Sequence, residues 1–291
     1  MLVSYKMNQN NPWKYVEIDE IELENNPYLH PAKKENGKKP TEEAAPTGTP
    51  TITDAFHFLV LENIVCVDAD NKIFERHDKL YVAKDIERKG QAPINFTPYA
   101  AASHFEQKGL FSPSSALTCN IVAALFQQAV RLEADGKYTT LNREAKTVLD
   151  QYKDHGAGYG WHAQNTVIDY AAQRIIHYPH DADFPNHGGT SNINSSRPRT
   201  ELPFQKVSGI WPVKKTLEDM TLEDGLKHPL VSTFVKQFTG LTDPSILILI
   251  GQYFQKPAKV WFPTNPAKVE VCTETRAAWF GCLSSYLNLY G

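Results

Sequence analysis

Apolar and polar residues follow a short-period pattern in the segment FHFLVLENIVCVDADNKIFERHDKLYVA, which begins at Phe56. The segment has two apolar runs that are rich in strand-forming residues and that partly alternate with polar residues, which is typical of β-strands. The stretch DADNK separates the two runs, and Asp and Asn tolerate the backbone angles of a tight turn. The sequence therefore predicts a β-hairpin here, with Cys66 packed inside one of its strands.

A longer period begins at Ser115. Apolar residues recur there on one helical face, and Gly136 is placed to end the helix, so we expect a helix over about 115–135. We expect further helices over 141–155, 161–176, 216–228 and 275–290, and strands over 229–238, 245–254 and 258–263. Because helices come first and strands after them, the pattern favours an α+β fold over a regularly alternating one.

One segment lacks large apolar residues almost completely. Residues 31–54, PAKKENGKKPTEEAAPTGTPTITD, have the Pro, Gly, Lys, Glu and Thr content of a flexible linker. This linker divides the chain into an N-terminal arm over 1–30 and an α+β domain over 55–291, with a β-rich subregion over 55–97 and a core over 98–291. The acidic run EIDEIELE in the arm suits binding to a protein partner.

Composition narrows the class of protein. The chain has 291 residues, of which 41% are hydrophobic and 22% charged, as is ordinary for a globular protein. A net charge of −3 without a basic cluster argues against binding to nucleic acid or to an anionic membrane. The run ILILI is too short to cross a bilayer.

The N-terminal residues and the cysteines indicate the cellular compartment. The first residues show no secretory leader. The four cysteines form no CxxC pair; they are Cys66, Cys119, Cys272 and Cys282. We therefore expect a cytoplasmic protein with reduced thiols, and a single bridge between Cys272 and Cys282 is the alternative.

Cys119 is the candidate with the clearest chemistry. It follows SPSS, whose Ser and Pro residues are favoured where a helix begins. A cysteine in the first turn of a helix is held as the nucleophilic thiolate by the free N–H groups and the helix dipole. The alternative is a buried thiol that only fills space in the core.

The segment HFEQKGLFSPSSALTCNIVAALF resembles the nucleophile segment of papain-like cysteine peptidases of the bacteriocin-processing (double-glycine) peptidase-like group. The stretches LEDGLKHPLVST, DPSILILIGQYF and KVWFPTNPA follow in the order of that group, so the resemblance covers roughly residue 98 to the C-terminus. It implies a papain-like fold, in which the nucleophile helix packs on an antiparallel sheet. It also implies thiol-dependent cleavage of a peptide or a peptide-like amide.

The resemblance assigns roles to individual residues. Cys119 matches the nucleophile, Gln107 the side chain that polarises the carbonyl oxygen, and Asn265 the residue that orients the histidine. The histidine position itself is occupied by Ser245, which can neither activate a thiol nor protonate a leaving amine.

Three explanations of this departure stay open. The register of the match is wrong, or another histidine replaces the missing one, with His228 and His104 the best placed and His155 and His162 further choices. The third explanation is that the protein is a catalytically inactive binding or structural module.

A cluster of five histidines between His155 and His187 offers different chemistry. Its stretch HYPHDAD supplies His177, His180 and Asp183, which suit a divalent transition metal. A metal-dependent hydrolase is therefore a second alternative, and apart from this metal the sequence indicates no cofactor. A polar surface loop with unrelated histidines explains the same residues.

Overall fold

The computed structural model describes part of the chain. The described residues are 3–4, 7–8, 11–15, 57–86, 88–89, 92–93, 101, 104–105, 108, 110–153, 160–169, 172–178, 199–205, 221–260, 275–282 and 287–290. The predicted linker over 31–54 lies outside them. For residues 3–15, 88–93, 160–163 and 275–290, only the backbone elements are described.

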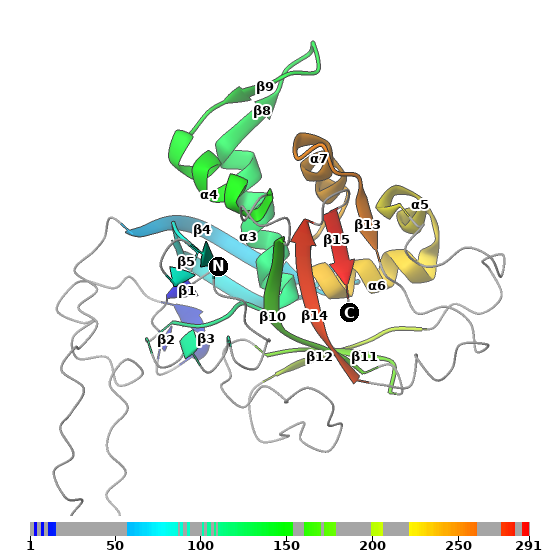
Figure 1. Ribbon diagram of the computed structural model, residues 1–291. Helices are drawn as coiled ribbons and strands as arrows, with labels where there is room; N and C mark the ends of the chain where they lie inside the picture. Colours follow the sequence, from blue (N-terminus) through cyan, green and yellow to red (C-terminus); the bar gives the residue numbers. More distant parts are fainter. Residues whose placement is uncertain are drawn as a thin grey trace, which may run out of the picture.

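Helices and short antiparallel sheets alternate irregularly along the chain (Figure 1). In chain order the elements are β1 (Val3–Ser4), β2 (Met7–Asn8), β3 (Asn11–Tyr15), β4 (Phe58–Val67), β5 (Ile73–Ala83), β6 (Arg88–Lys89), β7 (Ala92–Pro93), α3 (Ser115–Ala129), β8 (Val130–Leu132), β9 (Tyr138–Thr140), α4 (Arg143–Lys153), β10 (Gly160–Asp169), β11 (Arg174–His177), β12 (Thr200–Pro203), α5 (Leu222–Lys227), α6 (Pro229–Thr239), α7 (Ile246–Tyr253), β13 (Ala258–Val260), β14 (Thr275–Cys282) and β15 (Leu287–Tyr290). The fold class is mixed α+β, as the sequence predicts.

The predicted hairpin is confirmed as β4 and β5, which pair antiparallel along most of their length. In the turn, the side chain of Asp68 accepts hydrogen bonds from the backbone N–H groups of Asp70 and Lys72, at 2.9 and 2.8 Å. Asn71 adopts φ = 62°, a left-handed conformation that asparagine tolerates. Strand β1 of the N-terminal arm adds to the β5 edge.

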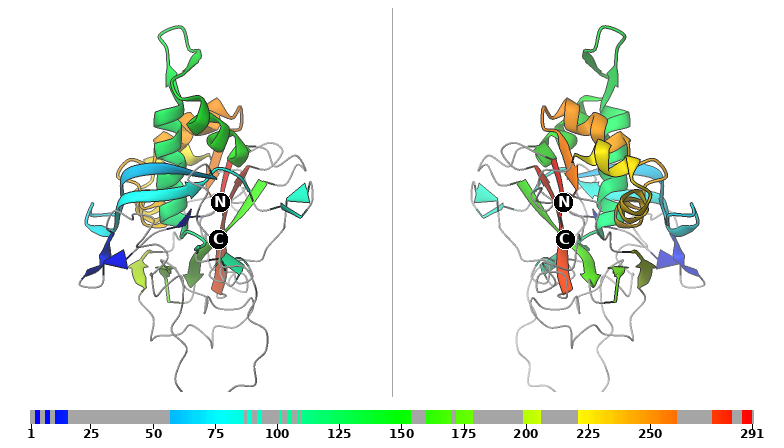
Figure 2. Two further views of the ribbon diagram at one scale, coloured as in Figure 1. Left: turned by 90° about the vertical axis from the view of Figure 1, so that its left-hand side faces the viewer. Right: turned by 90° about the vertical axis from the view of Figure 1, so that its right-hand side faces the viewer.

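Helix α3 is the centre of the described structure. Ser114 caps it, because its hydroxyl accepts a hydrogen bond from the Leu117 N–H at 3.1 Å. The helix packs against β4, α4 and α6, and the β4–β5 pair crosses it (Figure 2). Most of its residues are buried.

The helix is shorter than the prediction of 115–135. It ends at Ala129, and the chain passes directly into the projecting hairpin β8–β9 (Figure 1). Gly136 lies in the turn of that hairpin at φ = 80° instead of ending the helix. The apolar residues Val130 and Leu132 continue the helical period by chance, but Leu132 is exposed on the hairpin.

The largest sheet has six strands in the order β12-β11-β10-β14-β15-β13. All its pairs are antiparallel except β13 with β15. The register between β10 and β14 shifts between Ala163 and Val167, so β10 carries an irregularity there. In this interval the Asn165 N–H donates to the carbonyl of Pro113, just before α3, at 3.0 Å. This hydrogen bond therefore connects the irregular part of β10 to the residues just before the helix.

Two segments predicted as strands are helices. Residues 229–238 belong to α6 and residues 245–254 to α7. In α6 the buried residues Val231, Phe234, Val235 and Phe238 follow the helical period, and Pro229 at its start and Gly240 at its end are helix boundary residues. The β-branched and aromatic residues of this segment suggest a strand, but the helical spacing of its buried residues agrees with the helix that forms. The run ILILI of α7 has no period that separates the two structures.

Two segments predicted as helices are strands. Residues 161–176 form most of the β10–β11 hairpin, and residues 275–290 contain β14 and β15. Strand β10 is buried at every position from Gln164 to Asp169, so its pattern lacks the alternation that marks a half-exposed strand. The prediction of a helix over 141–155 is confirmed by α4, and the strand predicted at 258–263 by β13.

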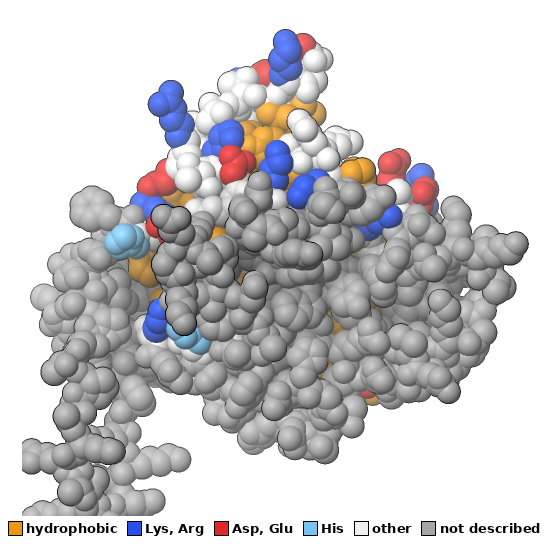
Figure 3. Space-filling model, viewed as in Figure 1, with side chains coloured by type: hydrophobic (Ala, Val, Ile, Leu, Met, Phe, Trp, Pro, Cys, Tyr) orange, Lys and Arg blue, Asp and Glu red, His pale blue; other side chains and the backbone are white. Residues whose placement is uncertain are grey.

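Strands β4 and β5 and helices α3, α6 and α7 share one apolar core. It includes Leu61 of β4, Leu80 of β5, Leu117 of α3, Phe238 of α6 and Ile250 of α7, all at most 1% exposed. On the described part of the surface, apolar side chains gather around the β8–β9 hairpin among Lys and Arg residues (Figure 3). None of the helices in the described ranges has the length and apolarity needed to cross a bilayer.

Candidate functional site

Cys119 is the fifth residue of α3 and so lies in its second turn, whereas a thiol activated by the helix N-terminus belongs in the first. Its side chain is 0% exposed and belongs to the apolar core. Burial raises the pKa of the Cys119 thiol far above its ordinary value. Since the thiolate is the nucleophile, this setting suppresses the chemistry that the sequence suggests.

The two histidines proposed as bases are described but do not pair with this thiol. His104 packs edge-on against Phe105, with the ring centroids 5.1 Å apart. His228 lies between α5 and α6, where it ends one helix and precedes Pro229 of the next. Within the described ranges, Cys119 has no hydrogen bond or ion pair with either imidazole.

Most of the other predicted site residues lie outside the described part of the chain. These are Gln107, Asn265, His180, Asp183 and His155, and only the backbone of His162 is described. Ser245, which occupies the histidine position of the resemblance, precedes α7, and its N–H donates to the Asp243 side chain at 2.9 Å. That bond shapes the turn into α7.

His177 is linked to the start of α3 through Thr166. Its Nδ1 lies 3.0 Å from the hydroxyl of Thr166, and its Nε2 lies 2.9 Å from the carbonyl oxygen of Gln237. The Thr166 hydroxyl accepts the N–H of Ser115 at 2.8 Å, and the Ser115 hydroxyl donates to the Phe238 carbonyl at 2.8 Å. We call these contacts the Ser115–Thr166–His177 network; they join α3, β10, β11 and α6.

The donors and acceptors of this network determine where its protons lie. A carbonyl oxygen only accepts, so Nε2 of His177 must carry the proton that Gln237 receives. Burial lowers the pKa of His177 from 6.5 to about 4, so the ring is neutral at pH 7 and Nδ1 is an acceptor. Thr166 therefore donates to Nδ1.

Proton transfer from Ser115 through Thr166 to His177 would require the Ser115 hydroxyl to turn its single proton from the Phe238 carbonyl to the Thr166 oxygen, 3.1 Å away. The strength of the base argues against its use in catalysis. An imidazole with a pKa of about 4 is a poor proton acceptor at neutral pH, where an efficient general base has a pKa near 7. Ser115 is also 0% exposed. The network is thus a structural connection between four elements.

Beside this network lie polar atoms without partners. Gln164 and Asn165 are 0% exposed, and neither the oxygen nor the nitrogen of either side-chain amide makes a hydrogen bond to any residue in the described ranges. The same holds for the hydroxyl of Thr118 and the side-chain oxygen of Gln237. Burying such a group without a partner costs about 1–3 kcal/mol. Native proteins keep few such groups, so a concentration of them calls for a physical explanation.

The sequence pattern does not single out these residues. Gln, Asn and Thr are common in exposed loops, and the segment 161–176 is predicted as a helix. The only sequence signal is a run of three polar residues, Gln164, Asn165 and Thr166, just before the apolar pair Val167 and Ile168. The run is buried because β10 pairs with β11 and contacts the start of α3, and the sequence pattern contains neither contact.

The structure also bears on the predicted metal ligands. Both ring nitrogens of His177 are engaged by Thr166 and Gln237, so a metal would have to displace one of these bonds. Within the described ranges no group of three or more His, Cys, Asp or Glu residues is arranged to hold a metal ion. The metal prediction therefore depends on His180 and Asp183, which are not described.

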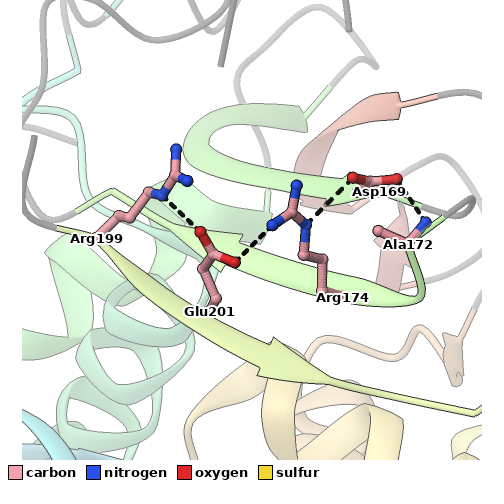
Figure 4. Close-up of polar contacts among 5 residues, drawn as sticks. All are labelled: Asp169, Ala172, Arg174, Arg199 and Glu201. Carbon is pink, nitrogen blue, oxygen red and sulfur yellow. Dashed lines mark hydrogen bonds and ion pairs between the residues drawn. The ribbon is translucent and has the colours of Figure 1, made fainter. Parts of the chain in front are cut away.

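A second polar cluster crosses the edge of the large sheet (Figure 4). Arg174 on β11 bridges Asp169 of β10 at 3.2 Å and Glu201 of β12 at 2.6 Å, and Arg199 adds a contact to Glu201 at 2.6 Å. Two positive and two negative side chains alternate, so their charges compensate one another. The cluster ties β12 to its neighbours instead of presenting a charge to a ligand.

No protein-family model matches the chain, and neither the curated proteins nor the solved structures contain a match.

Proposed function

We propose that this protein is a binding or structural module and that it does not use Cys119 for hydrolysis. The observation that carries the proposal is the burial of the Cys119 sulfur in the apolar core, with a raised pKa and no imidazole partner in the described ranges. Asn120, the next residue, serves the packing of α3, because its amide donates to the carbonyls of Thr239 and Gly240 at 3.2 and 3.0 Å.

A papain-like fold is part of the proposal. What supports it is the packing of α3 beside the antiparallel strands β11–β10–β14, with polar residues of β10 and β11 near the start of the helix. In that arrangement the start of α3 faces β10 and β11, and the contact includes Ser115, Thr166 and His177. A thiol peptidase acting on a peptide or a peptide-like amide is the competing function, and it requires a conformation in which Cys119 becomes accessible.

Thiol reactivity tests the proposal. We expect iodoacetamide to modify Cys119 in the native protein at least about 100-fold more slowly than in guanidinium-denatured protein, because the sulfur is inaccessible and protonated. Mass spectrometry of proteolytic fragments would quantify each cysteine separately over pH 6–9. Cys66 is an internal control, since burial also raises its thiol pKa.

Rapid labelling of Cys119 at neutral pH, with Cys66 still protected, would contradict the proposal and favour a thiol hydrolase. A Cys119→Ser variant would then distinguish reactivity from catalysis, since a peptidase loses cleavage of a peptide substrate when its sulfur is removed.

A further inference from the structure

The β8–β9 hairpin and α7 expose apolar side chains next to one another. Leu132 of β8 is 47% exposed and lies opposite Tyr138 of β9, whose hydroxyl donates to the Leu249 carbonyl of α7 at 3.3 Å. Leu249 itself is 39% exposed, and the Tyr138 and Tyr253 rings meet edge-on with their centroids 5.1 Å apart. We call the surface formed by these four residues the hairpin surface. Contiguous apolar surface of this kind marks sites where another protein binds.

An aromatic cluster holds the hairpin surface in place. Phe126 of α3 contacts the rings of both Tyr138 and Tyr253, with centroid distances of 6.0 and 5.9 Å. The Tyr253 hydroxyl also donates to the Asp150 side chain of α4 at 2.9 Å. The hairpin is thus fixed relative to α3, α4 and α7, and a partner that binds there does not have to order it first.

The charge around the hairpin surface is positive, although the whole chain has a net charge of −3. Residues 130–153 and 246–256 together contain six Lys or Arg residues and four Asp or Glu residues. Lys146 borders the surface, because its Nζ lies 5.9 Å from the centroid of the Tyr253 ring. Its ion pair with Asp150 is partly exposed, and such pairs are weak enough to exchange for another carboxylate.

This excess of positive charge distinguishes between possible protein partners. Two hairpin surfaces packed against each other would bring like charges together, which disfavours that contact. A segment with apolar residues between carboxylates complements both the leucines and the Lys and Arg residues around them. The run EIDEIELE at residues 17–24 has this pattern, since it contains five acidic residues with Ile18, Ile21 and Leu23 between them.

The position of β3 favours the acidic run of a second copy over that of the same copy. Strand β3 contacts β5 and ends at Tyr15, two residues before the run. It lies below the β4–β5 pair in Figure 1, whereas the β8–β9 hairpin projects above that pair. An extended chain covers at most about 3.6 Å per residue, so the run of the same copy starts near β3 and away from the hairpin surface.

We propose that the hairpin surface binds residues 17–24 of a second copy of this chain. The inference rests on the proposed binding function and names its partner. In this contact the apolar residues of the run cover Leu132 and Leu249, and its carboxylates face the Lys and Arg residues around them. Two copies that exchange their arms form a closed, symmetric dimer.

Sedimentation velocity of the full chain over a range of concentrations tests this contact. We expect a reversible dimer whose dissociation constant rises about tenfold between about 50 and 500 mM NaCl, because salt screens attraction between exposed charges. The synthetic peptide VEIDEIELEN, which has the sequence of residues 16–25, should compete with the arm and return the protein to a monomer.

Variants on the two sides of the contact provide the matched comparison. Leu132→Asp with Leu249→Asp should weaken the dimer at least about tenfold, because carboxylates on the surface repel those of the run. Glu20→Lys with Glu22→Lys in the arm should weaken it similarly. Ile73→Asp changes an isoleucine of β5 that is 50% exposed and lies outside the hairpin surface, so this variant should dimerise like the wild type.

A protein that is monomeric at all concentrations would overturn the proposal, and so would a dimer that the surface and arm variants leave unchanged. The arm variant and the peptide competition decide the question even if the double leucine variant does not fold. Each negative result leaves the thiol proposal intact, because Cys119 labelling does not depend on association.

Discussion

At the scale of single residues, the environment of a side chain decides its chemistry. Cys119 and His177 are the residue types from which catalytic sites are built, and both are buried in this fold. Burial disfavours the charged form of each, so it raises the thiol pKa and lowers the imidazole pKa. Both shifts remove reactivity at neutral pH. In the described part of the chain, the neutral amides of Gln164 and Asn165 are instead buried without a hydrogen-bond partner.

The lowered pKa of His177 predicts a pH dependence of stability. The unfolded chain binds the proton below pH 6.5 and the folded chain only below about pH 4, so acid stabilises the unfolded state between these values. We expect this residue to remove about 3 kcal/mol of unfolding free energy as pH falls from 7 to 4, with no further loss below that. Above pH 6.5 this residue does not make the unfolding free energy depend on pH.

Guanidinium unfolding of the wild type and His177→Gln between pH 7 and 4 isolates this contribution. The variant should be less stable at pH 7, because Thr166 loses its acceptor, and its stability should fall less steeply with acid. Parallel slopes for the wild type and His177→Gln would show that the imidazole does not titrate differently in the two states.

At the scale of elements, boundaries were predicted best where a local signal determines them. The β4–β5 turn has Asp and Asn, and α3 begins at a serine cap. Segments without a clear period were predicted worst. The apolar run of α7 and the uniformly buried positions 164–169 of β10 show neither period clearly, so their partners select the structure: α7 contacts α3 and β13, and β10 lies between β11 and β14.

Gly240 provides a test of how closely α6 approaches its neighbours. It ends α6 at φ = 60°, and a Cβ there would lie 2.7 Å from that of Ala116 and 3.1 Å from that of Cys66. We expect Gly240→Ala to lower the unfolding free energy by about 2–4 kcal/mol, since backbone strain and overpacking add. Chemical denaturation measures the change.

Gly136 is the matched control for this substitution. It has φ = 80° in the β8–β9 turn, but a Cβ there meets nothing within 4 Å. Gly136→Ala should therefore cost only the backbone strain, about 1 kcal/mol. Equal losses for the two variants would indicate that α6 can move away from α3 and β4 without cost.

At the scale of the molecule, the β4–β5 pair, α3, α6 and α7 share one core. A core defect in one element should therefore weaken distant elements as well, as expected when a domain unfolds in one cooperative step.

Leu61→Ala tests this cooperativity. Leu61 is 0% exposed on β4, so its truncation should cost about 2–5 kcal/mol and should speed global hydrogen exchange in α6 and α7 as well as in β5. Val60→Ala, at the adjacent residue with 39% exposure, should have little effect. Faster exchange confined to β4 and β5 would show that the hairpin unfolds as a separate unit.

By itself, the sequence determined the mixed α+β class, the β4–β5 hairpin, the cap of α3 and helix α4, because turn chemistry, capping and amphipathic period act between residues close in the chain. Only the tertiary structure decided that α7 is a helix, that β10 and β14 are strands, and that Cys119 is buried, as are Gln164 and Asn165, whose side-chain amides have no hydrogen-bond partner in the described part of the chain. Burial and hydrogen-bond satisfaction depend on segments far apart in the chain, so no local pattern contains them.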